Sequence, residues 1–298
     1  MPSLPVRPAG GPPAPVQEAR ADAVAAQFKL RMQIAENLRK IRHQVIVMSG
    51  KGGVGKSTVA VNLAAAFAEK GWKVGLLDLD LTNPNVPLMV HLEGSRPRGS
   101  AEGRIEPVKL RENLSVMSTA FFLDDRKEAI VWRGPIKMKM IQDFLGQVAW
   151  GELDVLVVDL PPGTGDEPLS IAQLLKDADG VVVVTTPQSV SVLDVRKSMR
   201  FAATMGLPVL GIVENMAGFV CPHCRHETDV FSRGGGAAIA DEFKVPLLAS
   251  VPLEPAVVES GEEGMPFVWK GGGSPAAVAF RALAEAVAAR LEEEGSPK

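Results

Sequence analysis

The sequence predicts an α/β fold in which a doubly wound, mostly parallel sheet carries helices on both faces. Three features predict this fold. Apolar runs alternate with helical segments from residue 44 onward, most runs are apolar at successive positions, and a glycine-rich segment follows the first run. Strands that are buried on both faces, as in parallel sheets, have such continuous apolar runs. Their alternation with helices builds a layered α/β domain.

Seven segments are expected to be strands, and helical segments lie between most of them. The expected strands are QVIVMSG, KVGLLDLD, NLSVMS, DVLVVDLPP, GVVVVTTP, PVLGIVENM and PLLASVPL. The expected helices lie near residues 56–70, 135–149, 167–177, 190–204, 234–243 and 274–293. The sequence has no internal repeat, and we expect a single domain over residues 43–293.

The two ends of the chain differ from this pattern. Residues 1–21 are rich in Pro, Gly and Ala and have no apolar period, which predicts a disordered tail. Residues 22–42 are expected to form an amphipathic helix that packs on the edge of the domain. Residues 294–298 are expected to be a flexible tail.

Composition and charge limit the classes of partner. The chain carries 32 Lys and Arg against 35 Asp and Glu, a net charge of −3, so it offers no overall electrostatic reason to bind nucleic acid or an anionic membrane. No apolar run approaches the roughly 20 residues that span a bilayer. The N-terminal segment lacks the apolar core of a signal peptide. We therefore expect a cytoplasmic protein.

A phosphate-binding motif occupies the segment GKGGVGKS, which follows an expected strand and opens an expected helix. It fits the P-loop pattern G-x-x-x-x-G-K-[ST] in full, in the context that the pattern requires. Glycines let backbone N–H groups turn toward phosphates, and the helix N-terminus adds a positive dipole end. Lys56 should reach the β- and γ-phosphates, and the Ser57 hydroxyl should bind Mg²⁺. The expected nucleotide-binding residues of this segment are Gly50, Lys51, Gly52, Gly53, Val54, Gly55, Lys56, Ser57 and Thr58.

Carboxylates follow two of the expected strands. LLDLDLTNPN has Asp78 and Asp80 after the second strand, and VVDLPPGTGD has Asp159 and Asp166 after the fourth. Ligands of parallel α/β folds bind at the carboxyl ends of the strands, so these side chains can face the nucleotide. Asp159 resembles a Walker B aspartate, which holds Mg²⁺ through water, and Asp80 resembles the acid that positions the attacking water.

The remaining residues of these two segments have supporting roles. Asp78 is expected to support the loop or the ligands of the metal ion. Asp166 has two interpretations, since it can face the nucleotide or cap the helix that begins near Glu167. Gly163 permits the backbone rearrangement that a loop sensing the γ-phosphate needs.

Recognition of the base is expected at another strand end. Asn215 ends the expected strand PVLGIVEN, and its amide carries a donor and an acceptor that suit the edge of adenine. Backbone groups of the segment VPLEP, with Pro252 and Leu253, are expected on the other side of the base. On chemistry alone, a turn asparagine explains Asn215 at least as well, so both interpretations stay open.

Lys51 carries the first resemblance to a known class. An ordinary P-loop does not need a lysine directly after its first glycine. The segment KGGVGK closely resembles the deviant Walker A motif of the class that includes MinD, ParA and the nitrogenase iron protein. The resemblance implies that Lys51 crosses a dimer interface and neutralises the transferring phosphoryl group of the partner's nucleotide, as an arginine finger does. Lys51 would then be catalytic together with Lys56, Asp80 and Asp159; a solvated loop lysine is the alternative.

Further segments select one branch of this class. DLPPGTGDEPLS, VTTPQ, ENMAGFVCPHC and the stretch from FSRGGG to GMPFV resemble the Mrp/ApbC/Nbp-type P-loop ATPases over residues 35–270. The resemblance implies a homodimer that binds ATP and Mg²⁺, hydrolyses ATP slowly and carries an iron–sulfur cluster to apo-proteins, alongside assembly factors. Cys221 and Cys224, the only cysteines, lie in an expected loop at residues 219–228. By the resemblance they bind a cluster, of the 4Fe–4S type, that bridges the two subunits.

Other interpretations of the cysteine pair stay open. Two pairs supply four thiolates, which also suits a structural zinc ion, and the protein would then be a dimeric ATP-driven switch. His223 and His226 are expected to be solvated. A thioredoxin-like dithiol opens a helix, whereas CPHCRHETD is typical of a loop.

Two related classes disagree with the rest of the chain. A MinD-type membrane ATPase would need a basic amphipathic C-terminal helix, but the C-terminal segment EAVAARLEEEGSPK is acidic. A ParA-type DNA segregation ATPase would need a basic surface, which the net charge does not support. We therefore expect neither a membrane nor a nucleic acid as partner.

Overall fold

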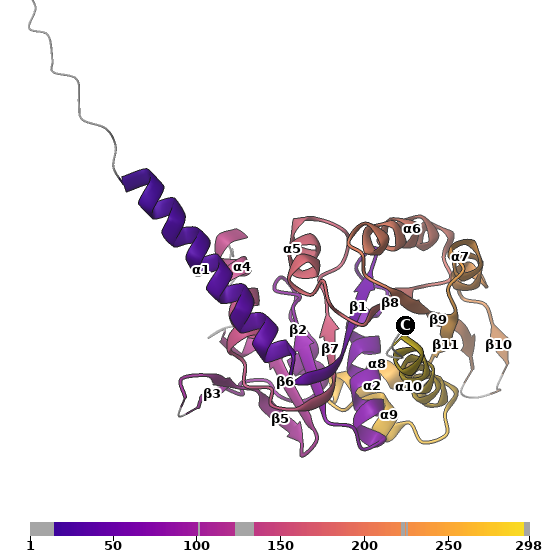
Figure 1. Cartoon of the computed structure of the whole chain (residues 1–298). Helices are drawn as coiled ribbons and strands as arrows, with labels where there is room; N and C mark the ends of the chain where they lie inside the picture. The colour runs from indigo at the N-terminus through magenta and orange to yellow at the C-terminus, as the bar shows by residue number, and fades with distance from the viewer. Residues whose placement is uncertain (1–14, 101, 123–133, 222–223, 225, 295–298) are drawn as a thin grey trace, which may run out of the picture.

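The fold is the predicted doubly wound, mostly parallel sheet with helices on both faces (Figure 1). The computed structural model describes residues 15–100, 102–122, 134–221, 224 and 226–294. Nine strands of these residues form one sheet in the order β10–β9–β8–β1–β7–β2–β6–β5, and β11 also pairs with β9. The strands of this sheet are β1 Ile41–Ser49, β2 Val74–Asp78, β5 Val108–Arg111, β6 Leu114–Ser118, β7 Leu153–Asp159, β8 Gly180–Thr185, β9 Val209–Val220, β10 Glu227–Thr228 and β11 Leu247–Leu253.

The central strands run parallel, so their carboxyl ends meet at one edge of the sheet. β1 lies between β7 and β8, and β2 lies between β7 and β6, all of them parallel. Only the pairs β5–β6 and β9–β10 of this sheet are antiparallel within the described residues. A separate two-stranded ribbon consists of β3 Arg98–Gly99 and β4 Ile105–Glu106.

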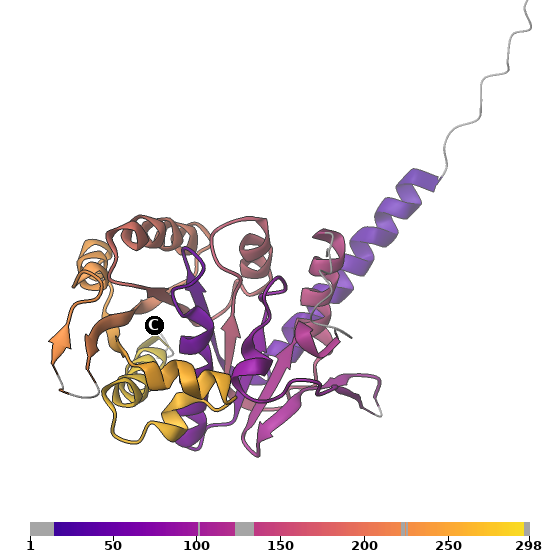
Figure 2. The ribbon, with the colours of Figure 1, turned by 180° about the vertical axis from the view of Figure 1, so that it is seen from behind.

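Helices cover the sheet on two sides. In Figures 1 and 2, α5, α6 and α7 lie along one side of the sheet, and α2, α8, α9 and α10 lie along the other. The helices are α1 Pro15–Leu38, α2 Lys56–Glu69, α3 Val86–Met89, α4 Gly134–Gln147, α5 Asp166–Leu174, α6 Ser189–Thr204, α7 Gly235–Phe243, α8 Pro255–Glu262, α9 Phe267–Lys270 and α10 Pro275–Glu294, with a 3₁₀ turn at Thr119–Phe122.

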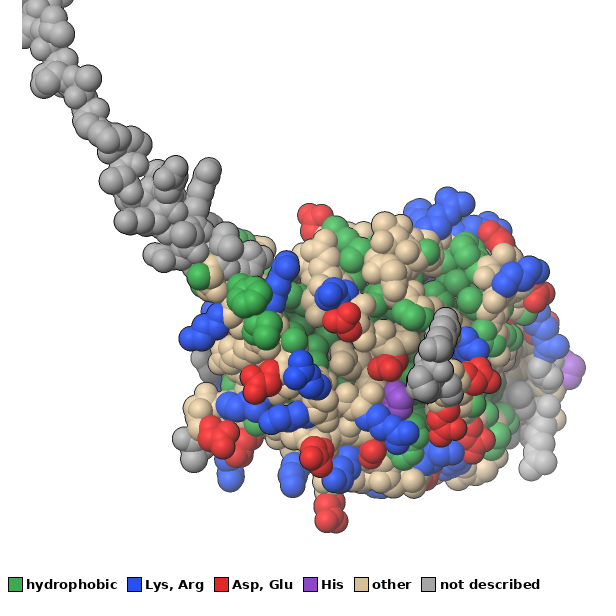
Figure 3. All heavy atoms as spheres, in the orientation of Figure 1, with side chains coloured by type: hydrophobic (Ala, Val, Ile, Leu, Met, Phe, Trp, Pro, Cys, Tyr) green, Lys and Arg blue, Asp and Glu red, His purple; other side chains and the backbone are tan. Residues whose placement is uncertain are grey.

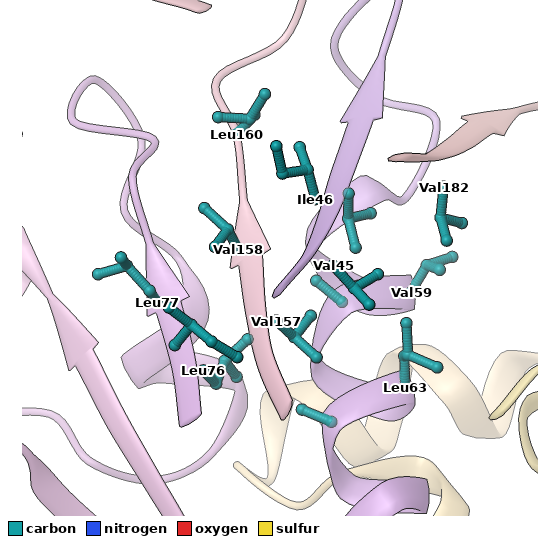
Figure 4. Packing of buried hydrophobic residues seen from close by; sticks show 14 of the residues in the cluster. Val45, Ile46, Val59, Leu63, Leu76, Leu77, Val157, Val158, Leu160 and Val182 are labelled. Carbon is teal, nitrogen blue, oxygen red and sulfur yellow. The ribbon is translucent and has the colours of Figure 1, made fainter. Parts of the chain in front are cut away.

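The core lies where α2 packs on the central strands (Figure 4). Val45 and Ile46 of β1, Val157 of β7, and Val59 and Leu63 of α2 are fully buried. Burying a side chain of this size contributes roughly 1.5–3 kcal/mol. Such a core holds α2, and therefore the loop before it, rigidly against the ends of β1 and β7.

The N-terminal helix differs from its expected bounds of 22–42. α1 begins at Pro15 and ends at Leu38, because Ile41–His43 join β1 instead. Proline at the start and the following QEARA segment suit the first turns of a helix. Residues 15–21 of the expected tail therefore belong to α1, and residues 1–14 and 295–298 lie outside the described residues. α1 projects from the body, and its C-terminal half lies along α4 (Figures 1 and 2).

A buried asparagine fixes α1 to α4. Nδ2 of Asn37 donates hydrogen bonds to the carbonyl oxygens of Leu145, at 2.8 Å, and Val148, at 2.9 Å. Oδ1 of Asn37 accepts a hydrogen bond from the guanidinium of Arg104. The side chain is 5% exposed, so an unmade hydrogen bond here would cost the full desolvation energy of its partner.

The surface charges and the lengths of the helices bear on whether the chain binds nucleic acid or crosses a membrane. In Figure 3, basic and acidic side chains are interspersed on the face of the molecule that is seen. None of the helices in the described part of the chain is both long and apolar enough to cross a membrane.

We predict that Asn37→Ala lowers the free energy of unfolding by about 2 kcal/mol, because it removes the side-chain donor to the carbonyl oxygen of buried Leu145 and an acceptor of the Arg104 guanidinium. The carbonyl oxygen of Val148 keeps its hydrogen bond from Arg104. Urea denaturation followed by circular dichroism measures this change. Gln33→Ala, at an exposed position of the same helix, is the control and should change it by less than about 0.5 kcal/mol. Equal effects of the two substitutions would contradict the assigned role of Asn37.

Candidate functional site

The segment GKGGVGKS links β1 to α2, and its path requires glycine. Gly53 and Gly55 both have φ of 79°, in the left-handed region that favours glycine. A Cβ on Gly55 would lie 2.1 Å from Nδ2 of Asn215, and one on Gly50 would lie 2.4 Å from the backbone carbonyl carbon of Asp194. The loop and the N-terminus of α2 line a pocket of about 320 Å³. A helix N-terminus in this position is an anion-binding element.

Two side chains of this loop converge on one buried carboxylate. Nζ of Lys56 lies 2.6 Å from Oδ1 of Asp159, and Oγ of Ser57 lies 2.6 Å from Oδ2. Lys56 is 6% exposed and Asp159 is fully buried. Asp159 thus satisfies both donors and joins the start of α2 to the end of β7. Lys56 and Ser57 also line the pocket, where an ammonium and a hydroxyl suit phosphate and a magnesium ion.

A second carboxylate lies beside Asp159 on the neighbouring strand. Asp78 and Asp159 are partners in the register of β2 and β7. Asp78 is fully buried and accepts hydrogen bonds from Oγ of Ser118, at 2.9 Å, and from the N–H of Asp80, at 3.1 Å. Burial, and then the charge of Asp159, raise the pKa of Asp78 to about 8, so that it holds a proton at neutral pH. Burial also raises the pKa of Asp159, and the Lys56 ammonium opposes that shift.

Asp80 begins the loop that follows β2. Its Oδ1 accepts a hydrogen bond from the N–H of Asn83, at 3.0 Å, and the residue is 6% exposed. Asp80 lines the same pocket as Lys56, so a carboxylate and the P-loop lysine share one chamber. Asn83 and Asn85 of this loop also line it. Sequence reasoning missed both, although they lie in the segment LLDLDLTNPN that indicated Asp78 and Asp80.

The loop after β7 closes another side of the pocket. Gly163 has φ of 88°, and its N–H donates a hydrogen bond of 2.9 Å to the carbonyl oxygen of Ser49 at the end of β1. The interpretation of Asp166 as a helix cap is wrong. α5 begins at Asp166 itself, and its cap position is Gly165, which has no side chain to form a cap hydrogen bond. Asp166 instead lines a pocket that adjoins Asp80.

The residues expected at the base lie around a second pocket, of about 330 Å³. Asn215, Pro252 and Leu253 line it, and Thr58 lines both this pocket and the phosphate pocket. Nδ2 of Asn215 donates a hydrogen bond of 2.9 Å to the carbonyl oxygen of Val54 in the P-loop. This arrangement leaves Asn215 near both the loop and the second pocket.

The sequence predicted that Asn215 ends its strand, and this prediction is wrong. β9 continues to Val220. Met216 has φ of 58° and Gly218 has φ of 77°, so the strand is irregular immediately after Asn215. The register with β11 shifts there too, between Val251 and Leu253. The irregularity lets the same strand leave the pocket and continue toward the cysteine pair.

Lys51 is half-buried and lines the phosphate pocket. Its carbonyl oxygen accepts a hydrogen bond of 2.9 Å from Oγ of Ser49. Its ammonium has no hydrogen bond or ion pair to any residue that the structure describes. The side chain is therefore available to an acceptor from outside this chain.

The two cysteines lie at the far end of β9. β9 and β10 form an antiparallel hairpin in which Val220 pairs with Glu227, and the N–H of Cys221 donates to the carbonyl oxygen of His226 at 2.9 Å. Cys221 and Cys224 lie between these two strands. The expected loop of 219–228 is too long at both ends, because residues 219–220 belong to β9 and residues 227–228 to β10. Cys221 is half-buried, Cys224 is exposed, and neither forms a disulfide. Among the described residues, which exclude His223, no three His, Cys, Asp or Glu side chains could hold a metal ion together.

The sheet, the glycine loop and the Lys56–Asp159 pair define the class of protein as a P-loop NTPase. The comparisons with known proteins then show the family. A model described as ParA, NUBPL iron-transfer P-loop NTPase, matches residues 40–288, and the chain belongs to this family.

Named relatives cover most of the chain. An iron-sulfur cluster carrier protein of Methanocaldococcus jannaschii is 48% identical over 79% of this chain and 81% of its own length. The human cytosolic Fe-S cluster assembly factor NUBP2 is 49% identical over 84% of this chain and 94% of its own length.

Solved structures confirm the fold. A nucleotide-binding protein from Archaeoglobus fulgidus, in complex with ADP, is 41% identical with a TM-score of 0.70, and the match covers 78% of this chain and 91% of that one. The cell division ATPase MinD of Pyrococcus furiosus is 25% identical with a TM-score of 0.63, over 83% of this chain and 99% of that one.

We predict that Asp78→Asn removes a decline in stability as the pH rises. The pKa of Asp78 is about 8 in the folded chain and about 3.9 for an unfolded aspartate. Between these values the folded chain binds the extra proton, so the free energy of unfolding falls as the pH rises, and it levels off above pH 8. Urea denaturation at pH 5.5, 6.5, 7.5 and 8.5 measures the slope.

The control for Asp78 is Asp177→Asn, whose carboxylate is 85% exposed. Its slope should equal that of the parent chain, whereas Asp78→Asn should flatten the slope over this pH range. An Asp78→Asn chain that loses stability with rising pH as steeply as its parent would show that Asp78 is ionised at neutral pH.

Proposed function

We propose that this chain is an ATP-hydrolysing iron–sulfur cluster carrier that binds a labile cluster between two copies of itself and transfers it to apo-proteins. One observation carries the proposal: a single strand, β9, contacts the P-loop through Asn215 and ends at the hairpin that bears Cys221 and Cys224. The names of the relatives support the cargo, since both name iron–sulfur clusters.

The residues present fit a magnesium nucleotide. Lys56 would exchange its contact with Asp159 for the β- and γ-phosphates, and the hydroxyl of Ser57 would become a ligand of Mg²⁺. Asp159, whose second oxygen holds Ser57 at 2.6 Å, would keep that ligand in place. Bound Mg²⁺ supplies neutralisation of phosphate charge. The ADP named with the Archaeoglobus relative supports a nucleotide in this pocket.

The base would lie in the second pocket, between Asn215 and the backbone of Pro252 and Leu253. Thr58 connects the two pockets and suits the α-phosphate. The amide of Asn215 already donates to Val54, so its carbonyl oxygen would be the group that faces an exocyclic amine. Adenine carries such a donor and is therefore compatible with this geometry.

Hydrolysis would need a second copy of the chain. Asp80 is suited to orient the attacking water, because it lies in the phosphate pocket without an ion pair to any residue that the structure describes. Lys51 is suited to reach the nucleotide of the partner subunit, since its ammonium has no acceptor in the described part of its own chain. Gly163 would let the adjoining loop respond to the γ-phosphate.

The cluster would also need both copies. One chain supplies two thiols, and a 4Fe–4S cluster takes four thiolate ligands. An isologous dimer brings the same loop from each copy, which completes the set. Accessible thiols at a hairpin turn suit a cluster that is given away rather than retained. A structural zinc ion on the same four cysteines is the competing outcome, with the protein then acting as an ATP-driven switch.

The proposed setting is the cytoplasm, with apo iron–sulfur proteins and assembly factors as partners. The word cytosolic in the name of the human relative supports this setting. The interspersed surface charges of Figure 3 give no support for nucleic acid as a partner.

We predict that Lys56→Ala abolishes nucleotide binding, whereas Lys51→Ala leaves the Kd for ATP within about threefold and lowers kcat by about a thousandfold. Titration with a fluorescent nucleotide and phosphate release measure the two effects. Mixing Lys51→Ala with Asp80→Asn tests the role in trans. Random dimers should recover about a quarter of the parental activity, because half of them are mixed and each mixed dimer has one complete site. No recovery would mean that Lys51 acts within its own subunit.

We predict that Cys221→Ala and Cys224→Ala each take up far less iron than the parent after anaerobic reconstitution, because each removes two of four ligands from the dimer. Iron and sulfide analysis with the visible absorption spectrum measures the loss. His226→Ala, at an exposed position, is the control and should keep its iron. Parental iron content in Cys221→Ala, or zinc in place of iron in the parent, would contradict the cluster-carrier proposal.

A further inference from the structure

Lys137 of α4 joins the two loops that flank the phosphate pocket. Its Nζ lies 3.0 Å from Oγ1 of Thr82 and 2.9 Å from Oε2 of Glu167. Thr82 belongs to the loop that begins at Asp80, and Glu167 lies in the first turn of α5, directly after the loop of Gly163. The Lys137 side chain is 21% exposed and that of Glu167 is 22% exposed, so water screens the ion pair only partly.

The contacted loops form the walls of one pocket beside the phosphate site. This pocket has a volume of about 430 Å³ and is lined by Asp80, Thr82 and Glu167, among others. It shares Asp80, Asn83 and Pro162 with the phosphate pocket. Thr82 lies two residues after Asp80 in the same loop, so a displacement of Thr82 would act on the segment that carries Asp80.

Glu167 depends on Lys137 for charge compensation. Oε1 of Glu167 is buried and has no hydrogen-bond partner among the residues that the structure describes, whereas Oε2 accepts from Lys137. A partly buried carboxylate that loses its cation becomes costly where it stands, and it moves toward water. Without Lys137, the start of α5 and the loop before it would lose their present position.

The helix that carries Lys137 is itself held firmly. Ile141, Phe144 and Leu145 of α4 are buried, and Asn37 of α1 is bonded to the carbonyl oxygens near its C-terminal end. Lys137 therefore projects from a fixed helix onto two loops, which is the arrangement that positions a site.

We infer that Lys137 is a positioning residue for ATP hydrolysis, which holds the Asp80 loop and the Gly163 loop at a set distance so that both meet the γ-phosphate together. The inference rests on the proposed hydrolysis at this site. Lys137 touches neither pocket residue Lys56 nor Asp159, so it acts through Thr82 and Glu167 on the water-orienting Asp80.

Measurements of kcat and of nucleotide affinity distinguish a positioning role of Lys137 from a purely structural role. Lys137→Met should lower kcat for ATP by about tenfold or more and change KM and the Kd for ADP by less than about twofold, because only the loops at the γ-phosphate lose their support. Lys139→Met is the matched control on the same helix. Lys139 is 65% exposed, and among the residues that the structure describes its only ion pair is with Asp143 of the same helix. The kcat of Lys139→Met should therefore equal that of the parent.

A conservative substitution of Lys137 and a double substitution of Lys137 and Glu167 complete the test. Lys137→Arg should recover most of the lost turnover, because it keeps a charged donor. Glu167→Gln combined with Lys137→Met should cost less than the product of the two single effects, since both remove one interaction. A kcat of Lys137→Met equal to that of Lys139→Met, or effects that simply multiply, would overturn the inference while ATP hydrolysis by the parent stands.

A separate measurement applies if the parent binds nucleotide but does not hydrolyse ATP, which would refute the proposed function. Hydrogen–deuterium exchange of the ADP complex then tests the contact itself. Residues 80–85 and 161–168 should exchange faster in Lys137→Met than in Lys139→Met, with no difference elsewhere in the sheet. Equal exchange in both segments would overturn the role of Lys137.

Discussion

The contact of Lys56 and Ser57 with Asp159 is the interaction on which the rest of the site depends. It joins the first turn of α2 to the end of β7, where Asp159 is fully buried and Lys56 is 6% exposed. A buried carboxylate without a cation is costly, as is a buried ammonium without an acceptor. Each therefore requires the other, or a ligand that replaces it. A phosphate can replace Asp159 as the partner of the Lys56 ammonium. The contact therefore supports the loop, and it is also the contact that a bound phosphate would displace.

The neighbouring carboxylates follow from the same geometry. Parallel strands bring their carboxyl ends together, so Asp78 and Asp159 become partners across β2 and β7. Burial, and then repulsion by the Asp159 carboxylate, raise the pKa of Asp78 to about 8. The remaining negative charge stands opposite Lys56, at the edge where the P-loop turns. The electrostatics of the pocket are thus set by strand register as much as by the P-loop.

Much of this arrangement could be predicted from the sequence, because the signals are local. Seven apolar runs indicated seven of the strands of the main sheet, and GKGGVGKS indicated the phosphate loop. Sequence patterns did not predict the features that depend on contacts between residues far apart in the chain. The hydrogen bonds of Asn37 to α4 hold α1, and β9 extends past Asn215 because β10 and β11 pair with it. No sequence pattern indicated the contacts of Lys137, because Thr82 and Glu167 lie far from it in the chain. The position of the cysteine pair between two strands was predictable, whereas the ligands that the proposed cluster needs in addition are not among the described residues of this chain.

In the proposed function, Lys51 and the cysteine pair share one property: each is half of an arrangement that twofold symmetry would complete. Native mass spectrometry of the anaerobically reconstituted protein tests this most directly, because it reports subunit number and metal content of one particle. We predict iron and sulfide in the mass of the dimer, as one 4Fe–4S cluster, and none in the monomer. A cluster on the monomer, or a dimer that holds zinc without sulfide, would contradict it.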